Sequence, residues 1–159
     1  MSARSAHPEH AAASARPPAG PLLVTGATGF LGRHVLQALA EMQPQQRVLA
    51  LVRKRKDWAK QDWSAPLTRV EPLQGSVSGE GGVAGSEAWP ADPRLQGLTG
   101  IFHLAALVRH SRRDPTDLYA TNVEGTLRMV RLAAQYRCRM VFVSTSGTVG
   151  VFALSLIHI

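Results

Sequence analysis

The stretch TGATGFLG, residues 25–32, decides how this chain can fold. It follows a short apolar run at residues 22–24 and leads into a helical pattern over residues 30–42. Glycines between a strand and a helix allow a tight turn, a close approach of the backbone to a pyrophosphate, and close packing of the helix on the strand. The start of the helix adds free N–H groups and a partial positive charge. The stretch therefore predicts a dinucleotide-binding turn, with a purely structural turn as the alternative.

The remainder of the chain alternates between strand-like and helix-like segments. Apolar runs predict further strands at residues 47–52, 101–106 and 140–143, and more weakly at 67–73. A helix is predicted from Asp114-Pro115, an N-cap followed by proline, to about Tyr136. Strands that alternate with helices are typical of an α/β fold with a doubly wound parallel sheet.

Each predicted helix carries an apolar stripe that is expected to face the core. In the first helix the stripe consists of Leu31, Val35, Leu39 and Met42. In the second helix it consists of Val123, Leu127, Val130 and Ala134. Residues 74–99 are rich in Gly, Ser and Pro and are expected to be mostly loop with a short helix.

Length and composition fit one globular domain. The chain has 159 residues, of which 45% are hydrophobic, enough for a core. Lys and Arg number 18 against 11 Asp and Glu, a net charge of +7 that fits either an anionic ligand or solvated surface charge. No aromatic interleaving or nucleic-acid-binding motif accompanies the arginines, so a nucleic-acid partner is not expected.

Several features of the sequence bear on the compartment. The single Cys138 excludes an internal disulfide and suits a reducing environment. The longest apolar run, residues 147–159, is too short to cross a bilayer. Residues 1–20 are Ala/Ser/Pro-rich and lack the apolar middle of a secretory signal, so we expect a disordered tail. These features favour a cytoplasmic protein without a membrane partner.

The end of the second strand bears on the choice of cofactor. An acidic residue there usually holds the ribose hydroxyls of NAD, whereas an arginine accommodates the 2′-phosphate of NADP. This chain has Arg53-Lys54-Arg55, and its first acidic residue is Asp57. Arg33 could add a second cation, and the planar fork of arginine suits phosphate. The pattern favours NADP over NAD, with a solvated strand end as the alternative.

Four linked motifs resemble the extended branch of the short-chain dehydrogenase/reductase superfamily. They are TGATGFLG, HLAA at 103–106, YATNVEGT at 119–126 and VFVSTSGTVG at 141–150. The resemblance covers roughly residues 21–152 and implies a Rossmann NAD(P)-binding fold. The run HLAALVRHSRRDPTDLYATNVEGT looks most like reductases of the dihydroflavonol-reductase and 3β-hydroxysteroid-dehydrogenase kind.

The resemblance also implies a set of site residues. The expected cofactor contacts are Gly26, Thr28, Gly29, Phe30, Leu31, Gly32, Arg53, Lys54, Ser76, Val77, Leu104, Ala105, Ala106 and Asn122. Family members commonly place Asp where Ser76 stands, so the contact to the adenine is weaker or differently made. Asn122 is expected to support the active-site water network. Ser146, or failing it Thr145, is expected to hydrogen-bond the reacting carbonyl or hydroxyl. We expect His103 to be structural rather than catalytic, and no metal site.

The Tyr-x-x-x-Lys pair that the resemblance implies is missing. Tyr119 and Tyr136 have no Lys four positions on, and no Lys follows Lys60. The last six residues, LSLIHI at 154–159, are what CTG TCT CTT ATA CAC ATC encodes, a DNA used as the mosaic end in transposon-made sequencing libraries. Our hypothesis is a truncated Rossmann domain at residues 21–153 followed by an adapter-encoded end, inactive as it stands.

The function predicted is that of an NADP-dependent oxidoreductase that interconverts a ketone and a secondary alcohol of a small-molecule substrate by hydride transfer. Two alternatives share the superfamily: a thioester or fatty-acyl reductase, and a sugar-nucleotide epimerase or dehydratase. A third alternative is a non-enzymatic NADP-binding module. The nucleotide-binding half sets the cofactor, whereas substrate choice lies in a later part of such enzymes.

Overall fold

Five short strands form one parallel sheet in the order β3-β2-β1-β4-β5. The computed structural model describes residues 20–79, 88–108 and 116–144. The strands are β1 (Leu22–Thr25), β2 (Val48–Val52), β3 (Val70–Gln74), β4 (Gly100–His103) and β5 (Arg139–Phe142). Strand order reverses between β1 and β4, which makes the carboxyl ends of these two strands the switch point of a doubly wound sheet. The predicted fold class is confirmed.

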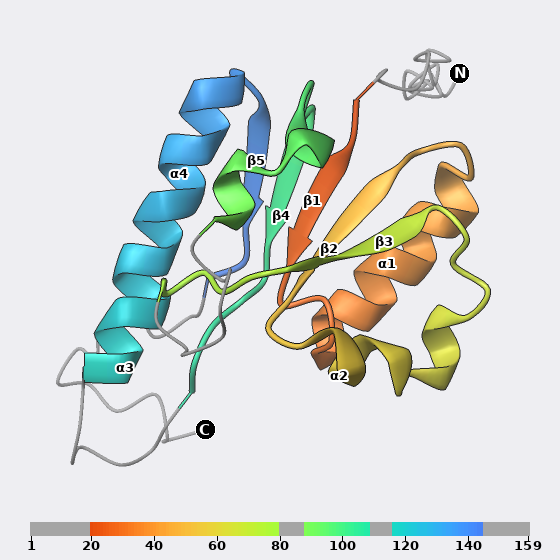
Figure 1. Ribbon diagram of the computed structural model, residues 1–159, viewed down its shortest axis with the longest axis horizontal. Coiled ribbons are helices and arrows are strands. Elements are labelled where there is room, and N and C mark those ends of the chain that lie inside the picture. The colour runs from red at the N-terminus through yellow and green to blue at the C-terminus, as the bar shows by residue number, and fades with distance from the viewer. Residues whose placement is uncertain (1–19, 80–87, 109–115, 145–159) are drawn as a thin grey trace, which may run out of the picture.

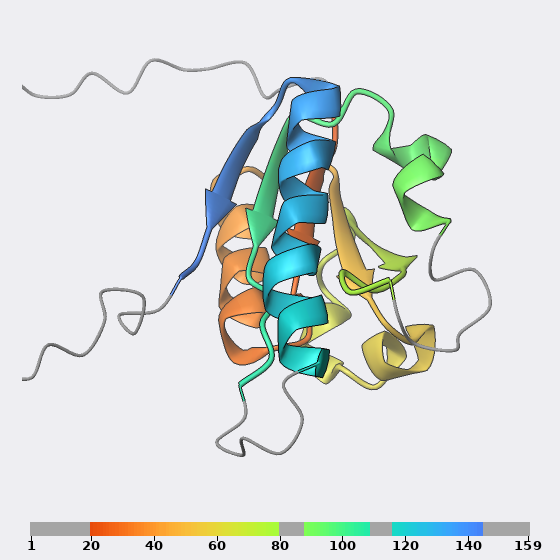
Figure 2. The ribbon, with the colours of Figure 1, turned by 90° about the vertical axis from the view of Figure 1, so that its left-hand side faces the viewer.

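Helices cover both faces of the sheet. Figure 1 shows α1 (Phe30–Met42) and α2 (Arg55–Ala59) on one side and α4 (Gly125–Tyr136) on the other. Helix α4 continues a short α3 (Thr116–Tyr119) through a π-helical turn, η4 (Ala120–Glu124). Three 3₁₀ turns complete the described elements: η1 (Asp62–Ser64), η2 (Trp89–Ala91) and η3 (Pro93–Leu95). Figure 2 shows the segment with η2 and η3 lying beside α4.

Two hydrophobic cores lie on the two faces of the sheet, because successive strand residues point in opposite directions. On the α1 side, Leu36 and Trp58 pack with strand residues such as Val24 and Ala50. On the α4 side, the core joins Leu23, Leu49 and Ile101 of the strands to Met129 and Leu132 of α4 and to Trp89 and Leu95 of the 3₁₀ turns. The central strands β1 and β2 are therefore buried on both faces, as their continuous apolar runs predicted, whereas β5 at the edge is largely exposed.

The observed boundaries refine the predicted strands. Strand β3 runs over 70–74 rather than 67–73, and β4 ends at His103 rather than at Ala106. Residues 104–106 instead form the connection that leaves the carboxyl end of β4. The predicted tail at residues 1–20, except for Gly20, and the predicted adapter-encoded end at residues 154–159 lie outside the described residues, as do Thr145 and Ser146.

The predicted apolar stripe of α4 is wrong, and that of α1 is right only in part: Leu39 is partly buried and packs against the core, and Val35 is partly buried. In α1 the buried residues are Gly32 and Leu36, whereas Leu31 is 51% exposed and Met42 is 80% exposed. In α4 the buried residues are Gly125, Met129, Leu132 and Ala133. The predicted Val123, Leu127 and Val130 are 39–49% exposed, and Ala134 is exposed. Each helix is rotated about its axis relative to the prediction, with a glycine on its buried face.

Candidate functional site

The turn after β1 approaches the end of β4 very closely. Gly26 has a φ of +68°, a left-handed conformation that glycine adopts without strain. A Cβ on Gly26 would lie 2.8 Å from the backbone of Leu104 and Ala105, so a side chain would occupy the gap between the two segments. Gly29 is the N-cap of α1, and the first turn of α1 contains no acidic residue. The positive end of the helix dipole is thus available to an anion.

A cavity of about 810 Å³ opens at this turn. Its volume lies in the range typical of small-molecule and cofactor sites. The carboxyl ends of β1, β2, β3 and β4 all contribute to it, as ligand binding at a switch point requires. Its lining residues are Gly26, Thr28, Gly29, Leu51, Val52, Arg53, Lys54, Asp57, Gly75, Ser76, Val77, Ser78, Leu104, Ala105, Ala106, Leu107, Asp117, Ala120 and Thr121.

Ten of the predicted cofactor contacts line this cavity. They are Gly26, Thr28, Gly29, Arg53, Lys54, Ser76, Val77, Leu104, Ala105 and Ala106. Phe30 and Leu31 do not line it and are 75% and 51% exposed. Gly32 is buried against the turn, where a Cβ would meet the Gly26 carbonyl oxygen at 2.2 Å. Its place in the site is to hold α1 against the turn.

Asn122 also lies outside the cavity lining, but it holds a residue that lines the cavity. Its side-chain oxygen accepts from the Leu107 N–H at 2.8 Å, and its Nδ2 donates to the Leu107 carbonyl at 2.9 Å. Both polar ends of the amide are therefore engaged with one backbone unit. The π-helical turn that carries Asn122 is a form of helix often found at functional sites.

The sequence reasoning missed several lining residues. Asp57, on α2, was noted only as the first acidic residue after the second strand, yet it lines the same cavity as Arg53 and Lys54. Gly75 and Ser78 follow β3, where a position at the carboxyl end of a parallel strand was the available signal. Asp117 had no signal of its own, whereas Thr121 lies in the YATNVEGT motif but was not singled out there.

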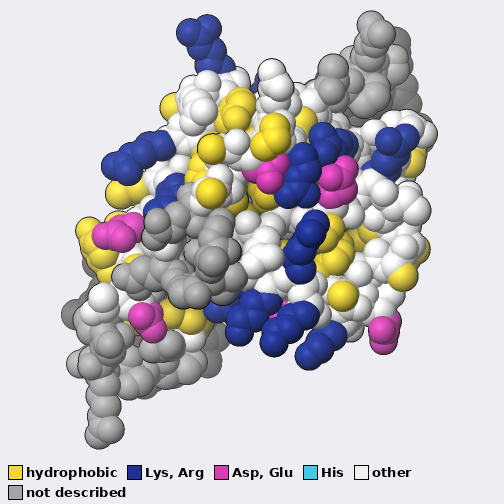
Figure 3. All heavy atoms as spheres, viewed as in Figure 1, with side chains coloured by type: hydrophobic (Ala, Val, Ile, Leu, Met, Phe, Trp, Pro, Cys, Tyr) yellow, Lys and Arg dark blue, Asp and Glu magenta, His cyan; other side chains and the backbone are white. Residues whose placement is uncertain are grey.

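Cations gather at the rim of the cavity. Residues 53–56 are four consecutive Arg and Lys residues with exposed side chains. Figure 3 shows Lys and Arg side chains along the lower edge of the face, at the place of α2 in Figure 1. A cationic rim attracts an anionic ligand and raises its local concentration.

His103 is completely buried next to the turn. It is the last residue of β4 and pairs in register with Thr25 of β1 and Phe142 of β5. Its ring stacks on that of Phe142 with centroids 5.5 Å apart. Burial lowers the pKa of the imidazole below its ordinary value, so the ring is neutral at neutral pH. His103 is absent from the cavity lining.

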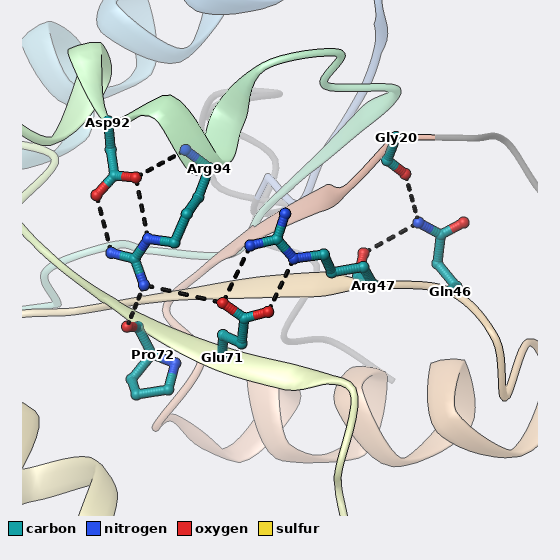
Figure 4. Close-up of polar contacts among 7 residues, drawn as sticks. All are labelled: Gly20, Gln46, Arg47, Glu71, Pro72, Asp92 and Arg94. Atoms are coloured by element: carbon teal, nitrogen blue, oxygen red, sulfur yellow. Dashed lines mark hydrogen bonds and ion pairs between the residues drawn. The ribbon is translucent and has the colours of Figure 1, made fainter.

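A second polar cluster lies away from the cavity, toward the amino-terminal ends of the strands. Arg47 donates to both oxygens of Glu71 at 2.8 and 3.1 Å, and Arg94 donates to both oxygens of Asp92 and to the Pro72 carbonyl (Figure 4). These hydrogen bonds lower the carboxyl pKa of Glu71 and of Asp92. The cluster fastens the segment after η2 to β3, which is a structural task.

Comparison with known proteins agrees with this geometry. An NAD-binding family model described as "Male sterility protein" matches residues 24–154. The 3 beta-hydroxysteroid dehydrogenase type 7 of Rattus norvegicus is 31% identical over 140 residues, covering 86% of this chain and 39% of that protein. The dihydroflavonol 4-reductase of Hordeum vulgare is 29% identical over 143 residues, covering 83% of this chain and 36% of the enzyme. A solved structure of a short-chain dehydrogenase/reductase superfamily protein from Agrobacterium tumefaciens with bound NAD has 28% identity and a TM-score of 0.56, over 78% of this chain and 32% of that one.

The chain belongs to the extended short-chain dehydrogenase/reductase family. The predicted resemblance is confirmed, and the described residues form an NAD(P)-binding Rossmann domain. This short-chain dehydrogenase/reductase chain spans under two-fifths of the length of each of these three relatives. By their names, the two enzymes act on small molecules.

Two further observations concern the described part of this family member. Within residues 20–79, 88–108 and 116–144, no three His, Cys, Asp or Glu side chains gather in a way that could hold a metal ion. Across the same ranges, each helix is too short or too polar to span a bilayer.

Proposed function

We propose that this chain is the cofactor-binding part of an NADP-dependent oxidoreductase that interconverts a ketone and a secondary alcohol. One observation carries the choice of NADP: Arg53 and Lys54 line the same cavity as the glycine turn. A guanidinium donates two parallel hydrogen bonds to a phosphate and also neutralises its negative charge. The 2′-hydroxyl of NAD carries no charge and gains less from the same arginine. The names of the relatives, a hydroxysteroid dehydrogenase and a dihydroflavonol reductase, support the ketone–alcohol reaction.

The residues present fit a dinucleotide. The space beside Gly26 would be filled by any Cβ, so only glycine leaves the turn open to a pyrophosphate. The N–H groups at the start of α1 would bind the pyrophosphate, and Arg53 and Lys54 would bind the 2′-phosphate. Residues 104–107 would form the wall opposite, and Ser76 and Val77 would lie at the adenine end.

The chemistry divides between cofactor and chain. NADP, when bound, exchanges a hydride with the substrate carbon. Asn122 would act by holding the wall at Leu107 rather than by contacting substrate, because both ends of its amide bond to that residue. Ser146 stays the proposed hydrogen-bond donor to the reacting oxygen. Because this polypeptide has no Tyr-x-x-x-Lys pair, we expect it to bind cofactor without turnover.

Calorimetric titration with NADPH and with NADH tests the proposal. Arg53→Ala should weaken NADPH binding by about 10- to 100-fold, since a charge-assisted hydrogen bond contributes about 1.5–3 kcal/mol. The same variant should leave NADH binding nearly unchanged. Arg55→Ala is the matched control. It removes an equal charge only two residues from Arg53, but the Arg55 side chain does not line the cavity. Equal losses in both variants, or tighter binding of NADH than of NADPH, would count against the proposal.

A further inference from the structure

A continuous set of hydrogen bonds passes through the buried imidazole of His103. On one side, His103 Nδ1 lies 2.7 Å from the Thr25 hydroxyl. On the other side, His103 Nε2 lies 3.1 Å from the Thr126 hydroxyl of α4. Thr25 and His103 are both 0% exposed, so water does not compete for the bond between them. The His103 side chain of β4 thus connects β1 to α4.

The partners of the two hydroxyls fix where each proton lies. Thr25 Oγ1 accepts from the N–H groups of Leu104 and Ala105, both at 3.2 Å. Its two lone pairs are then occupied, so it must donate its own proton to Nδ1 of His103. A neutral imidazole that accepts at Nδ1 carries its proton on Nε2, which donates to Thr126. The Thr126 hydroxyl in turn donates to the Asn122 carbonyl at 2.7 Å.

The opposite tautomer would break this order. A proton on Nδ1 would give the Thr25 oxygen a third donor and would leave the Thr25 hydroxyl proton without the imidazole acceptor. Nε2 would then have to accept from Thr126, which would withdraw the hydroxyl proton from the Asn122 carbonyl. Buried polar groups that lose a partner cost about 1–3 kcal/mol each, so the first order is strongly preferred.

Both ends of this network hold the same wall of the cavity. Thr25 binds the N–H groups of Leu104 and Ala105, at one end of the segment 104–107. Asn122 binds the N–H and carbonyl of Leu107, at the other end. All four residues of the segment line the cavity. His103 is the link between the two points of attachment.

We propose that His103, as its neutral Nε2–H tautomer, is a positioning residue that sets the cofactor-site wall at residues 104–107 by joining Thr25 to Thr126. The inference rests on the proposed function only in naming the ligand of that wall. His103 is not an acid or base for the substrate, because both ring nitrogens are engaged and the ring does not line the cavity.

The tautomer is measurable without any ligand. Two-bond ¹⁵N–¹H correlation spectra of the histidine rings distinguish Nε2–H from Nδ1–H and from imidazolium. The signals of His103 among the six histidines are assigned by their loss in His103→Asn. We expect the Nε2–H pattern at pH 7.5 in the full chain. An Nδ1–H or imidazolium pattern would overturn the proposal.

Variants at Thr126 test the coupling. Thr126→Val removes the acceptor of Nε2–H, and Thr126→Ser restores it. In Thr126→Val, amide hydrogen exchange at Leu104 and Ala105 should be about tenfold faster than in wild type, although Thr126 bonds to neither residue. NADPH should bind about tenfold more weakly. Thr126→Ser should return both readouts toward wild type. Thr99→Val is the matched control, since Thr99 donates to the carbonyls of Gly20 and Pro21 at the opposite end of β4.

The outcomes separate the two proposals. Failure of wild type to bind NADPH would overturn the proposed function, while the tautomer and the exchange rates would still decide the role of His103. If Thr126→Val changes exchange at Leu104 and Ala105 no more than Thr99→Val does, the network does not position the wall. If Thr126→Ser behaves like Thr126→Val, the hydroxyl is not what transmits the effect, and the proposal is again overturned.

Discussion

Gly32→Ala is expected to destabilise the fold, although alanine is the better helix former. Gly32 lies in the first turn of α1, where replacing glycine by alanine favours a helix by about 1 kcal/mol. The added Cβ, however, would lie 2.2 Å from the Gly26 oxygen and 2.7–2.8 Å from two backbone atoms of Ala27. All three neighbours are backbone atoms of the turn, so no side chain can rotate away. Helix and turn must separate.

The size of the effect follows from this separation. Contacts closer than 3.0 Å are essentially never seen for real Cβ atoms, so α1 must move by about 0.8 Å at this point. Overpacking of a core costs about 1–3 kcal/mol, and contact with backbone places this case at the upper end. After the gain in helix propensity, we expect a net loss of about 1–2 kcal/mol in the free energy of unfolding. The melting midpoint should fall by roughly 2–8 °C.

Two controls separate packing from propensity. Gly125→Ala makes the same change at the start of α4, but there the added Cβ would meet Val77 Cγ2 and Cβ at 3.1–3.2 Å, so a movement of a few tenths of an ångström relieves the contact. It should be close to neutral. Ala38→Gly, at an exposed site of α1, should cost about 1 kcal/mol and so calibrate the propensity. Urea unfolding followed by circular dichroism gives all four values. A Gly32→Ala variant as stable as wild type, beside a normal loss in Ala38→Gly, would refute the reasoning.

Three further predictions concern other parts of the chain. The free energy of unfolding should fall as the pH is lowered from 7.5 through about 6.5, because unfolded His103 takes up a proton that the folded state, with its lowered pKa, refuses. Urea titrations at several pH values should show that the free energy of unfolding depends less on pH in His103→Asn than in wild type. Glu71 and Asp92, whose pKa values are lowered, lose their stabilising contribution only below about pH 4.5, outside this range. Asp57→Asn should tighten NADPH binding several-fold in calorimetry by removing a negative charge from the cavity; weaker NADH binding with unchanged NADPH binding would instead assign Asp57 to the ribose hydroxyls. Val141→Lys should reduce self-association, seen as a smaller dependence of the melting midpoint on protein concentration; a sharp wild-type melt that does not change with concentration would contradict this.

The strands could be read from the sequence because buried parallel strands are continuous apolar runs. Residues 48–52 illustrate this, since every residue of β2 is buried. Strand ends were harder to place. Residues 104–106 are as apolar as the strand before them, but they line a cavity instead of pairing, and hydrophobicity alone does not separate these two environments.

The rotation of the helices was predicted wrongly, although the sequence held the clue. The glycines of the turn were expected to allow close packing of the helix on the strand, and the last of them, Gly32, is followed four positions later by Leu36, which is buried. The same relation holds in α4, where Met129 follows Gly125 and both are buried. The prediction gave weight to the large apolar residues beside each glycine, because a hydrophobic pattern is read from large side chains. Here the face of each helix that is buried is the one on which glycine lets the helix approach its neighbour closely. The π-helical turn adds a further shift of phase before α4 that no periodicity rule anticipates.

Ten of the residues predicted to contact the cofactor line the cavity, because they lie at the ends of strands or in the glycine turn, where topology fixes their place. The task of Asn122 could not be predicted from its motif alone. It depends on the backbone of Leu107, fifteen residues earlier, and only the fold brings the two together.

The two edges of the described sheet differ in a way that limits how copies of this chain can assemble. At β3 the edge carries Pro72, whose carbonyl accepts a hydrogen bond from Arg94. The ion pairs Arg47–Glu71 and Arg94–Asp92 lie beside it. At β5 the apolar residues Val141 and Phe142 are half exposed. An aggregate that grows strand by strand needs two adhesive edges on every copy, and this sheet offers one. Pairing of β5 with β5 of a second copy uses that edge twice and leaves only protected edges outside, so it closes as a two-fold symmetric dimer and ends growth there.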